Sequence, residues 1–138
     1  MREFHLETAG PIGDCAVIRV AGEVDVYTAP MLREQIRELA AKGAVHLIAD
    51  LGQVDFLDST GLGALVGGLK RLREEGGSLT LVITAPRIVR IFQITGLTKV
   101  LATQRSVTDA ITADPHWQQI AEGEAGSVQE WCRQHDLS

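Results

Sequence analysis

One short run, Asp58-Ser59-Thr60-Gly61, combines the residue types of a phosphorylation site with those of a helix start. Asp and Ser are preferred N-cap residues, and a helix N-terminus favours negative charge, so a phosphate on Ser59 would be well placed there. The carboxylates of Asp58 and Asp25 would oppose that phosphate. Because the two effects balance, the run predicts a switch rather than a permanent anion site. The alternative is that Asp58 and Ser59 are only helix caps.

Glycines follow the serine at positions where a helix gains nothing from them. Each glycine in a helix costs up to ~1 kcal/mol relative to alanine, so Gly61 and Gly63 are useful only if another backbone or a partner approaches closely. Gly67 and Gly68 are expected to let the helix pack close to the sheet. Thr60 is the competing phosphate acceptor, although its side chain is expected to belong to the first helical turn.

Other chemistries fit the sequence poorly. The glycines of residues 61–67 lie within a helix rather than in a strand-to-helix turn, and no lysine follows them as in a nucleotide-phosphate loop. A hydrolase would need a general base near Ser59, and we expect none of the four histidines at that edge of the sheet: His5, His46, His116 and His135. No histidine spacing indicates a metal site. The sequence therefore predicts a protein that is not an enzyme, with no catalytic residues, no metal and no cofactor.

The elements that must position this run alternate between strand and helix, which indicates an α/β sandwich. Strands are expected at residues 4–7, 15–21, 45–51, 79–83 and 100–102. Helices are expected from Thr28, whose side chain can cap the first of them, to Gly43, from Asp58 or Ser59 to Gly76, and over residues 86–95. Another is expected from Ser106, which resembles a capping pair with Asp109. The first two strands form a hairpin, whereas crossovers through helices make strands two, three and four parallel. Their carboxyl ends share one edge, which brings loops 22–27 and 52–61 together.

Composition bounds the remaining possibilities. The chain has 138 residues, 45% of them hydrophobic, and a formal net charge of −5, which suits one compact domain with its own core. No apolar run approaches the ~20 residues of a membrane-spanning helix, and the N-terminus lacks the features of a secretory signal. Two cysteines without CxxC spacing fit a reducing compartment. We therefore expect a cytoplasmic protein, and its acidic balance disfavours direct binding to nucleic acid or membrane.

The last 24 residues differ in charge from the rest. They contain four acids and one arginine, whereas residues 1–114 contain 14 acids and 12 bases. Asp114-Pro115 marks the boundary, because the residue before a proline is disfavoured in helical conformation. Residues 115–138 are thus expected to form a separate acidic helical extension.

The extension carries apolar side chains at helical spacing. A helix is expected from Ser127, with one face formed by Val128, Trp131, Cys132 and His135. Trp117 and Ile120 form a smaller apolar pair, which a flexible segment, residues 122–126, separates from this helix. We expect the helix to dock on the domain itself. A surface for a partner or for self-association is the alternative.

Three stretches together resemble bacterial anti-sigma factor antagonists, which are STAS-domain proteins. They are Gly22-Glu23-Val24-Asp25 followed by Thr28-Ala29, then residues 54–63, and finally residues 91–100. The resemblance covers about residues 4–113. It implies a STAS-type α/β fold over residues 1–114, with a mixed sheet of about four to five strands and helices packed mainly on one face.

The resemblance also implies a function. In this family the unphosphorylated antagonist binds an anti-sigma factor, which is also a serine kinase with a GHKL-type ATP-binding fold, and a sigma factor is thereby freed for transcription. The kinase then phosphorylates the serine after the motif aspartate, here Ser59, which ends binding, and a serine phosphatase reverses the modification. Carried over, Asp25 and Asp58 are the acids that shape the acceptor site. The contacted helix start comprises Thr60, Gly61, Leu62 and Gly63. A STAS scaffold or sensor module that binds a protein or small ligand without phosphorylation is the alternative.

Overall fold

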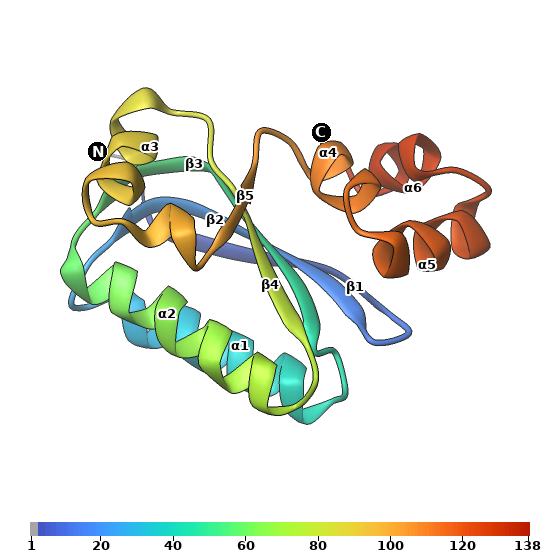
Figure 1. The fold of residues 1–138 in the computed structure, drawn as a ribbon, viewed down its shortest axis with the longest axis horizontal. Helices are drawn as coiled ribbons and strands as arrows, with labels where there is room; N and C mark the ends of the chain where they lie inside the picture. The colour runs from blue at the N-terminus through green and yellow to red at the C-terminus, as the bar shows by residue number, and fades with distance from the viewer. Residues whose placement is uncertain (1–2) are drawn as a thin grey trace.

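A mixed five-stranded sheet forms the centre of the computed structural model, which describes residues 3–138 (Figure 1). The strands are β1 (His5–Ile12), β2 (Cys15–Val24), β3 (His46–Leu57), β4 (Ser78–Val82) and β5 (Ala102–Gln104). They lie in chain order across the sheet, with β1 antiparallel to β2 and all later neighbours parallel. The predicted hairpin, parallel strands and fold class are confirmed.

The strand ends differ from the sequence prediction. β3 continues to Leu57, so residues 52–57 are strand rather than loop, because they pair with β2 as far as Val24 after β4 has ended opposite Asp50. β1 likewise extends to Ile12 through a register shift. The edge strand begins at Ala102, two residues later than predicted, because a 3-10 turn occupies Leu97–Lys99.

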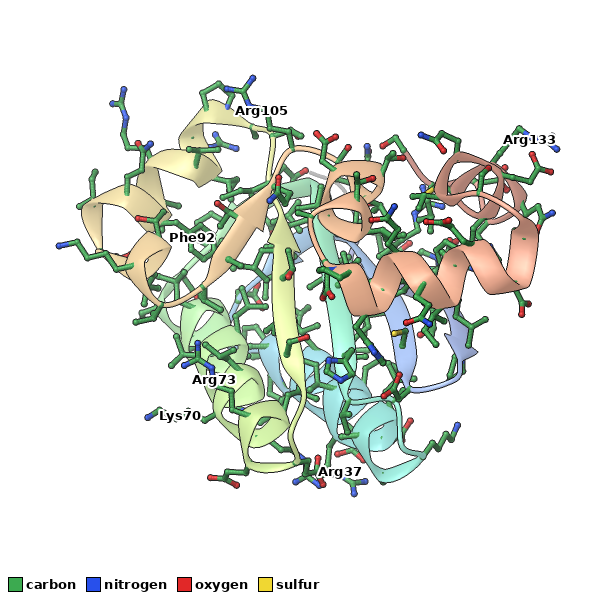
Figure 2. The ribbon with its side chains drawn as sticks, turned by 45° about the vertical axis from the view of Figure 1, so that its right-hand side comes forward. Arg37, Lys70, Arg73, Phe92, Arg105 and Arg133 are labelled. Atoms are coloured by element: carbon green, nitrogen blue, oxygen red, sulfur yellow. The ribbon has the colours of Figure 1, made fainter. Side chains whose placement is uncertain are left out.

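One face of the sheet is covered by α1 (Ala29–Ala41), α2 (Ser59–Glu74) and α3 (Pro86–Ile94). Side chains of β2 alternate between the faces, and Ala16, Ile18 and Val20 join these helices in the first core. Figure 2 shows Lys70 of α2 pointing away from the sheet, while Phe92 of α3 is fully buried. The Arg73 guanidinium donates to the Val100 carbonyl at 3.3 Å. Basic side chains in the last turn of α2 suit its negative end.

Two helix glycines have roles that the sequence did not predict. A Cβ on Gly68 would lie 2.8 Å from Cδ1 of Ile36, so Gly68 brings α2 close to α1 rather than to the sheet. Gly67 is exposed, and a Cβ there would meet nothing within 4 Å. Of this pair, only Gly68 therefore contributes to the packing of α2 against α1.

The other face is covered by α4 (Val107–Thr112), α5 (Pro115–Ala125) and α6 (Val128–Gln134). Their apolar side chains form a second core with β2, β3 and β4, including Cys15, Val17, Ile48 and Val82. The Ser106 and Ser127 hydroxyls accept the N–H groups of Asp109 and Glu130 at 3.0 and 3.1 Å, as their capping patterns predicted. In Figure 1 these helices lie at the opposite end of the sheet from the start of α2.

The prediction that residues 122–126 form a flexible segment is wrong. Residues up to Ala125 continue α5, and only Gly126, with φ of 90°, ends it. The helix persists because Asp114 caps it, Trp117 and Ala121 are buried along it, and Gly123 faces open space. Over residues 3–138, no helix is long and apolar enough to cross a membrane.

Candidate partner-binding site

Asp58 caps the start of α2 and organises its first turn. Its Oδ1 accepts the backbone N–H groups of Thr60 at 2.9 Å and Gly61 at 3.2 Å, and the Thr60 hydroxyl also donates to it. The Thr60 hydroxyl, aided by the two backbone N–H groups, lowers the pKa of Asp58 below its ordinary value against the opposing effect of desolvation. The cap is therefore a carboxylate at neutral pH.

Ser59 is the exposed hydroxyl of this turn. It is the first residue of α2, and its hydroxyl makes no hydrogen bond to any residue in the described range 3–138. Thr60 differs, since its hydroxyl is engaged by Asp58. The Ser59 hydroxyl can therefore be reached by a partner, whereas the Thr60 hydroxyl is held in the cap by Asp58.

Asp25 holds the loop that follows β2. Its Oδ1 accepts the N–H groups of Tyr27 at 2.9 Å and Thr28 at 3.1 Å, an Asx-type turn. The Thr28 hydroxyl accepts the Asp25 N–H at 2.9 Å and donates to the Glu23 carbonyl at 2.8 Å. Thr28 is the N-cap residue of α1, but its side chain makes no capping bond. The prediction of a capping Thr28 side chain is therefore wrong, because its hydroxyl is used to fix the loop.

The loop after β2 and the junction between β3 and α2 meet at the predicted edge of the sheet. The Asp58 N–H donates to the Val24 carbonyl at 3.3 Å, and Val24 pairs with Leu57 at the ends of β2 and β3. A Cβ on Gly61 would lie 2.5 Å from Cδ1 of Leu57 and 2.9 Å from Cγ1 of Val24. Gly61 is buried, so it shapes the site from inside by letting the first turn of α2 approach both strands.

The remaining members of the predicted helix start differ in exposure. Gly63 is exposed, and a Cβ there would meet nothing within 4 Å. Leu62 is partly buried against the first core. Gly63 and Ser59 therefore offer the open surface of this turn, whereas Leu62 anchors it.

The two glycines form a matched pair for substitution. We expect Gly61→Ala to destabilise the fold by about 1–3 kcal/mol, because the new methyl overlaps Leu57 and Val24. Gly63→Ala should instead raise stability by up to ~1 kcal/mol, since it adds helix propensity in open space. Urea denaturation followed by circular dichroism measures both. Equal effects of the two substitutions would contradict the close approach at Gly61.

Exposed apolar side chains gather around the same edge, and they were not predicted from the sequence. Val26 and Tyr27 follow β2, Met31 lies in the first turn of α1, and Phe56 is near the end of β3; their exposed fractions are 57%, 84%, 54% and 45%. Large apolar residues in the loop after a strand were the available signal. Exposed aromatic and methionine side chains are typical of protein interfaces.

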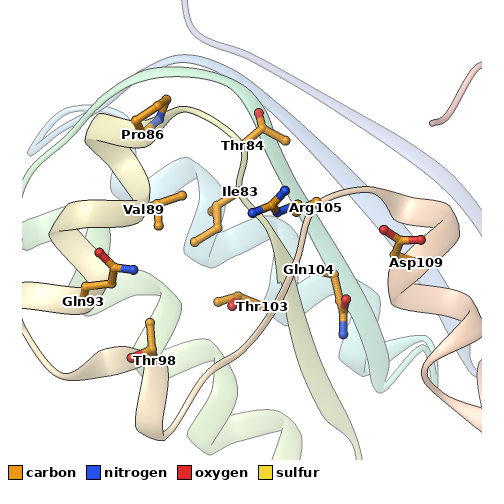
Figure 3. A pocket seen from close by; sticks show the side chains of 10 residues that line it. All are labelled: Ile83, Thr84, Pro86, Val89, Gln93, Thr98, Thr103, Gln104, Arg105 and Asp109. Atoms are coloured by element: carbon orange, nitrogen blue, oxygen red, sulfur yellow. The ribbon is translucent and has the colours of Figure 1, made fainter.

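A second surface feature lies at the carboxyl ends of β4 and β5. It is an open pocket of about 790 Å³, and Figure 3 shows Gln93 and Thr98 on one side and Gln104 and Asp109 on the other. Arg105, an exposed residue, also lines it. Its lining comes from several consecutive segments within residues 83–109, the end of β4 through the start of α4, so no single motif predicted it.

Comparison with known proteins places this chain in a family. Residues 7–110 match the STAS domain family. The anti-sigma-B factor antagonist of Bacillus subtilis (strain 168) is 46% identical over 84 residues, which are 61% of this chain and 76% of that protein. A crystal structure of an anti-sigma factor antagonist from Mycobacterium paratuberculosis has a TM-score of 0.73 at 32% identity, covering 80% of this chain and 93% of the other.

A further solved structure is the Bacillus cell fate determinant SpoIIAA in its phosphorylated form. It has a TM-score of 0.61 at 27% identity, and the likeness covers 80% of this chain and 98% of that one. With a family match over most of its length and relatives of this kind, the chain belongs to the STAS domain family and is similar there to the anti-sigma factor antagonists.

Proposed function

We propose that this protein is an anti-sigma factor antagonist controlled by phosphorylation of Ser59. Unphosphorylated, it binds an anti-sigma factor and so releases a sigma factor for transcription. The anti-sigma factor is a serine kinase of the GHKL type, which phosphorylates Ser59 and thereby ends the complex. A serine phosphatase restores the binding form. The observation that carries this proposal is an exposed Ser59 hydroxyl without a partner, at the start of a helix bordered by exposed apolar side chains.

The local geometry supports Ser59 as the acceptor. Its oxygen attacks the γ-phosphorus of ATP held by the kinase, a new O–P bond forms, and the bond to the bridging oxygen breaks to leave ADP. The hydroxyl proton passes to a base of the kinase. Thr60 is less suited, because its hydroxyl donates to Asp58 and must leave that bond to react.

The charges around Ser59 support a switch. Phosphorylation adds roughly −1.5 to −2 charges, and the N–H groups of Thr60 and Gly61 are already donated to the Asp58 carboxylate. The phosphate therefore gains neither of these donors and lies beside a negative group. In an interface it would need desolvation as well, so partner affinity falls without any change of fold.

The apolar border supports a protein partner rather than a small substrate. Val26, Tyr27, Met31 and Phe56 provide the apolar area that a protein interface buries at its centre. The Asp25 carboxylate fixes the backbone of the loop that carries Val26 and Tyr27. A partner thus meets a largely preformed surface.

The acceptor is tested by incubating the protein with ATP and its cognate kinase and mapping the phosphate by mass spectrometry. We expect one phosphate per chain on Ser59, and none on Ser59→Ala with Thr60 intact. The control is Ser106→Ala, which removes a hydroxyl from a different helix cap, and it should be phosphorylated as the wild type is. Phosphate incorporated into Ser59→Ala would contradict the assignment.

The pocket near β4 and β5 favours a second candidate function. A STAS scaffold or sensor module would bind a small ligand there, between Gln93 and Arg105, without phosphorylation. The same incubation separates the two functions. Absence of phosphate on the wild-type protein, with a kinase shown to phosphorylate another substrate, favours the scaffold.

A further inference from the structure

Four side chains with metal-binding atoms gather at the end of the sheet opposite to Ser59. Asp14 lies in the turn between β1 and β2, Cys15 begins β2, His46 begins β3, and His116 lies in the first turn of α5. Since β3 separates His46 from Leu57 by its whole length, on the order of 30 Å, this cluster is distinct from the partner-binding site.

Both histidines direct Nε2 at the same carboxylate. His116 Nε2 lies 2.7 Å from Oδ1 of Asp14, and His46 Nε2 lies 3.7 Å from Oδ2. The two rings are close, with centroids 4.5 Å apart. His46, His116 and Asp14 are partly accessible, at 20%, 43% and 40% exposure of their side chains, so an ion in solution can reach them.

The two separations between a histidine and Asp14 are close to those around a small tetrahedral ion. Zinc bonds of about 2.0–2.2 Å to nitrogen and oxygen place neighbouring donors roughly 3.4 Å apart. The 3.7 Å between His46 Nε2 and Asp14 Oδ2 is already close to this value. The shorter contact between His116 and Asp14 is a hydrogen bond to the carboxylate, and it would lengthen as the ion replaces the shared proton.

The surroundings also hold His46 in the required orientation. Its Nδ1 lies 2.9 Å from the Ser78 hydroxyl, which leaves Nε2 directed at Asp14. Such a partner on the second ring nitrogen is usual for metal-bound histidine. The ligand-type atoms of Asp14, Cys15 and His116 lie within 4.8 Å of one another. His46 is not a member of this compact group, so its ring has to move closer for all three proposed ligands to bind one ion. Cys15 is nevertheless fully buried in the second core, where burial, together with Asp14 and Asp114, raises the pKa of its thiol to about 12.

We propose that Asp14, His46 and His116 bind a divalent transition-metal ion of the zinc class. The ion would join three segments: the turn after β1, the start of β3 and the first helix of the acidic extension. Two neutral imidazoles and one carboxylate are a common donor set for zinc, with the fourth position left to water. Metal binding would thus fasten the extension to the sheet.

Zinc chloride added to the 138-residue protein tests this site. We expect the melting temperature to rise by about 5–10 °C when free zinc is about 100-fold above its dissociation constant. His46→Gln, His116→Gln and Asp14→Asn should each lose that rise, whereas Cys15→Ala should keep it. His5→Gln is the matched control, because His5 also pairs with a carboxylate, Glu7 at 2.9 Å. It should respond to zinc as the wild type does.

Cobalt provides a measurement that does not depend on the stability of the variants. Co²⁺ added to the wild-type protein should give the visible absorption of a four-coordinate site, and excess Zn²⁺ should remove it. An unchanged melting temperature with zinc, or an equal rise in His116→Gln and Asp14→Asn, would overturn the proposal. A rise lost in Cys15→Ala but kept in His46→Gln would overturn this ligand set.

Discussion

Ser59→Asp should weaken binding of the anti-sigma factor by roughly thirty- to a few-thousandfold, while Ser59→Ala binds at full strength and cannot be switched off. The aspartate brings a fixed negative charge to the interface beside Asp58, whose Oδ1 already accepts the two nearest N–H groups. Leaving a charge desolvated and unpaired in an interface costs about 2–5 kcal/mol, which corresponds to this range. Capture of the kinase on Ser59→Ala, followed by calorimetry with each variant, measures the effect.

Two controls show whether the loss of binding comes from a negative charge at position 59. One tests the size of the new side chain, and the other tests the net charge of the protein. Ser59→Asn has nearly the size of Ser59→Asp without its charge, so it should lose much less affinity. Gln129→Glu adds a negative charge on exposed α6, on the other face of the sheet, and should leave binding unchanged. If Ser59→Asn weakens binding as much as Ser59→Asp, crowding rather than charge governs the switch, and the electrostatic mechanism is incorrect.

Trp131→Ala should cause the largest loss of stability, about 3–5 kcal/mol, or a fall in melting temperature on the order of 10–20 °C. Trp131 has no exposed surface and packs edge-on against Trp117 with ring centroids 5.4 Å apart. The His135 ring lies against its other side at 4.3 Å. Removing the indole opens a cavity between α5, α6 and the sheet. Thermal denaturation followed by circular dichroism measures the loss.

Binding to the kinase should survive this substitution at temperatures where the variant is folded, because Trp131 belongs to the second core and the partner-binding site to the far end of the sheet. Trp131→Phe, which keeps an aromatic ring, should lose clearly less stability. A wild-type-like melting temperature for Trp131→Ala would mean that the extension is not docked in solution. Light scattering would then test self-association, the alternative use of this apolar surface.

The candidate site was largely predictable because it is local. Asp58, Ser59, Thr60 and Gly61 are consecutive, and the preference of Asp for the N-cap position does not depend on distant residues. The sequence also indicated the meeting of the two loops, because helical crossovers force β2 and β3 to be parallel. The role of Thr28 was missed, since its hydroxyl could either cap α1 or bind the Glu23 carbonyl, and only the loop conformation decides between them.

The helical extension was harder to predict, because its structure depends on contacts across the chain. Gly123 and Gly126 made residues 122–126 look flexible, yet burial of Trp117 and Ala121 keeps the helix intact up to Ala125. Helices of this length owe most of their stability to tertiary packing rather than to intrinsic propensity. The burial pattern exists only once α5 lies on the sheet.

The sequence by itself determined the α/β alternation, the parallel crossovers and the position of a serine at a capped helix start, since periodicity and capping act over a few residues. Only the tertiary structure decided how far β3 runs, which side chains border Ser59, and that His46 and His116 face one carboxylate. Those features depend on strand register and on the docking of the extension, which join residues far apart in the chain.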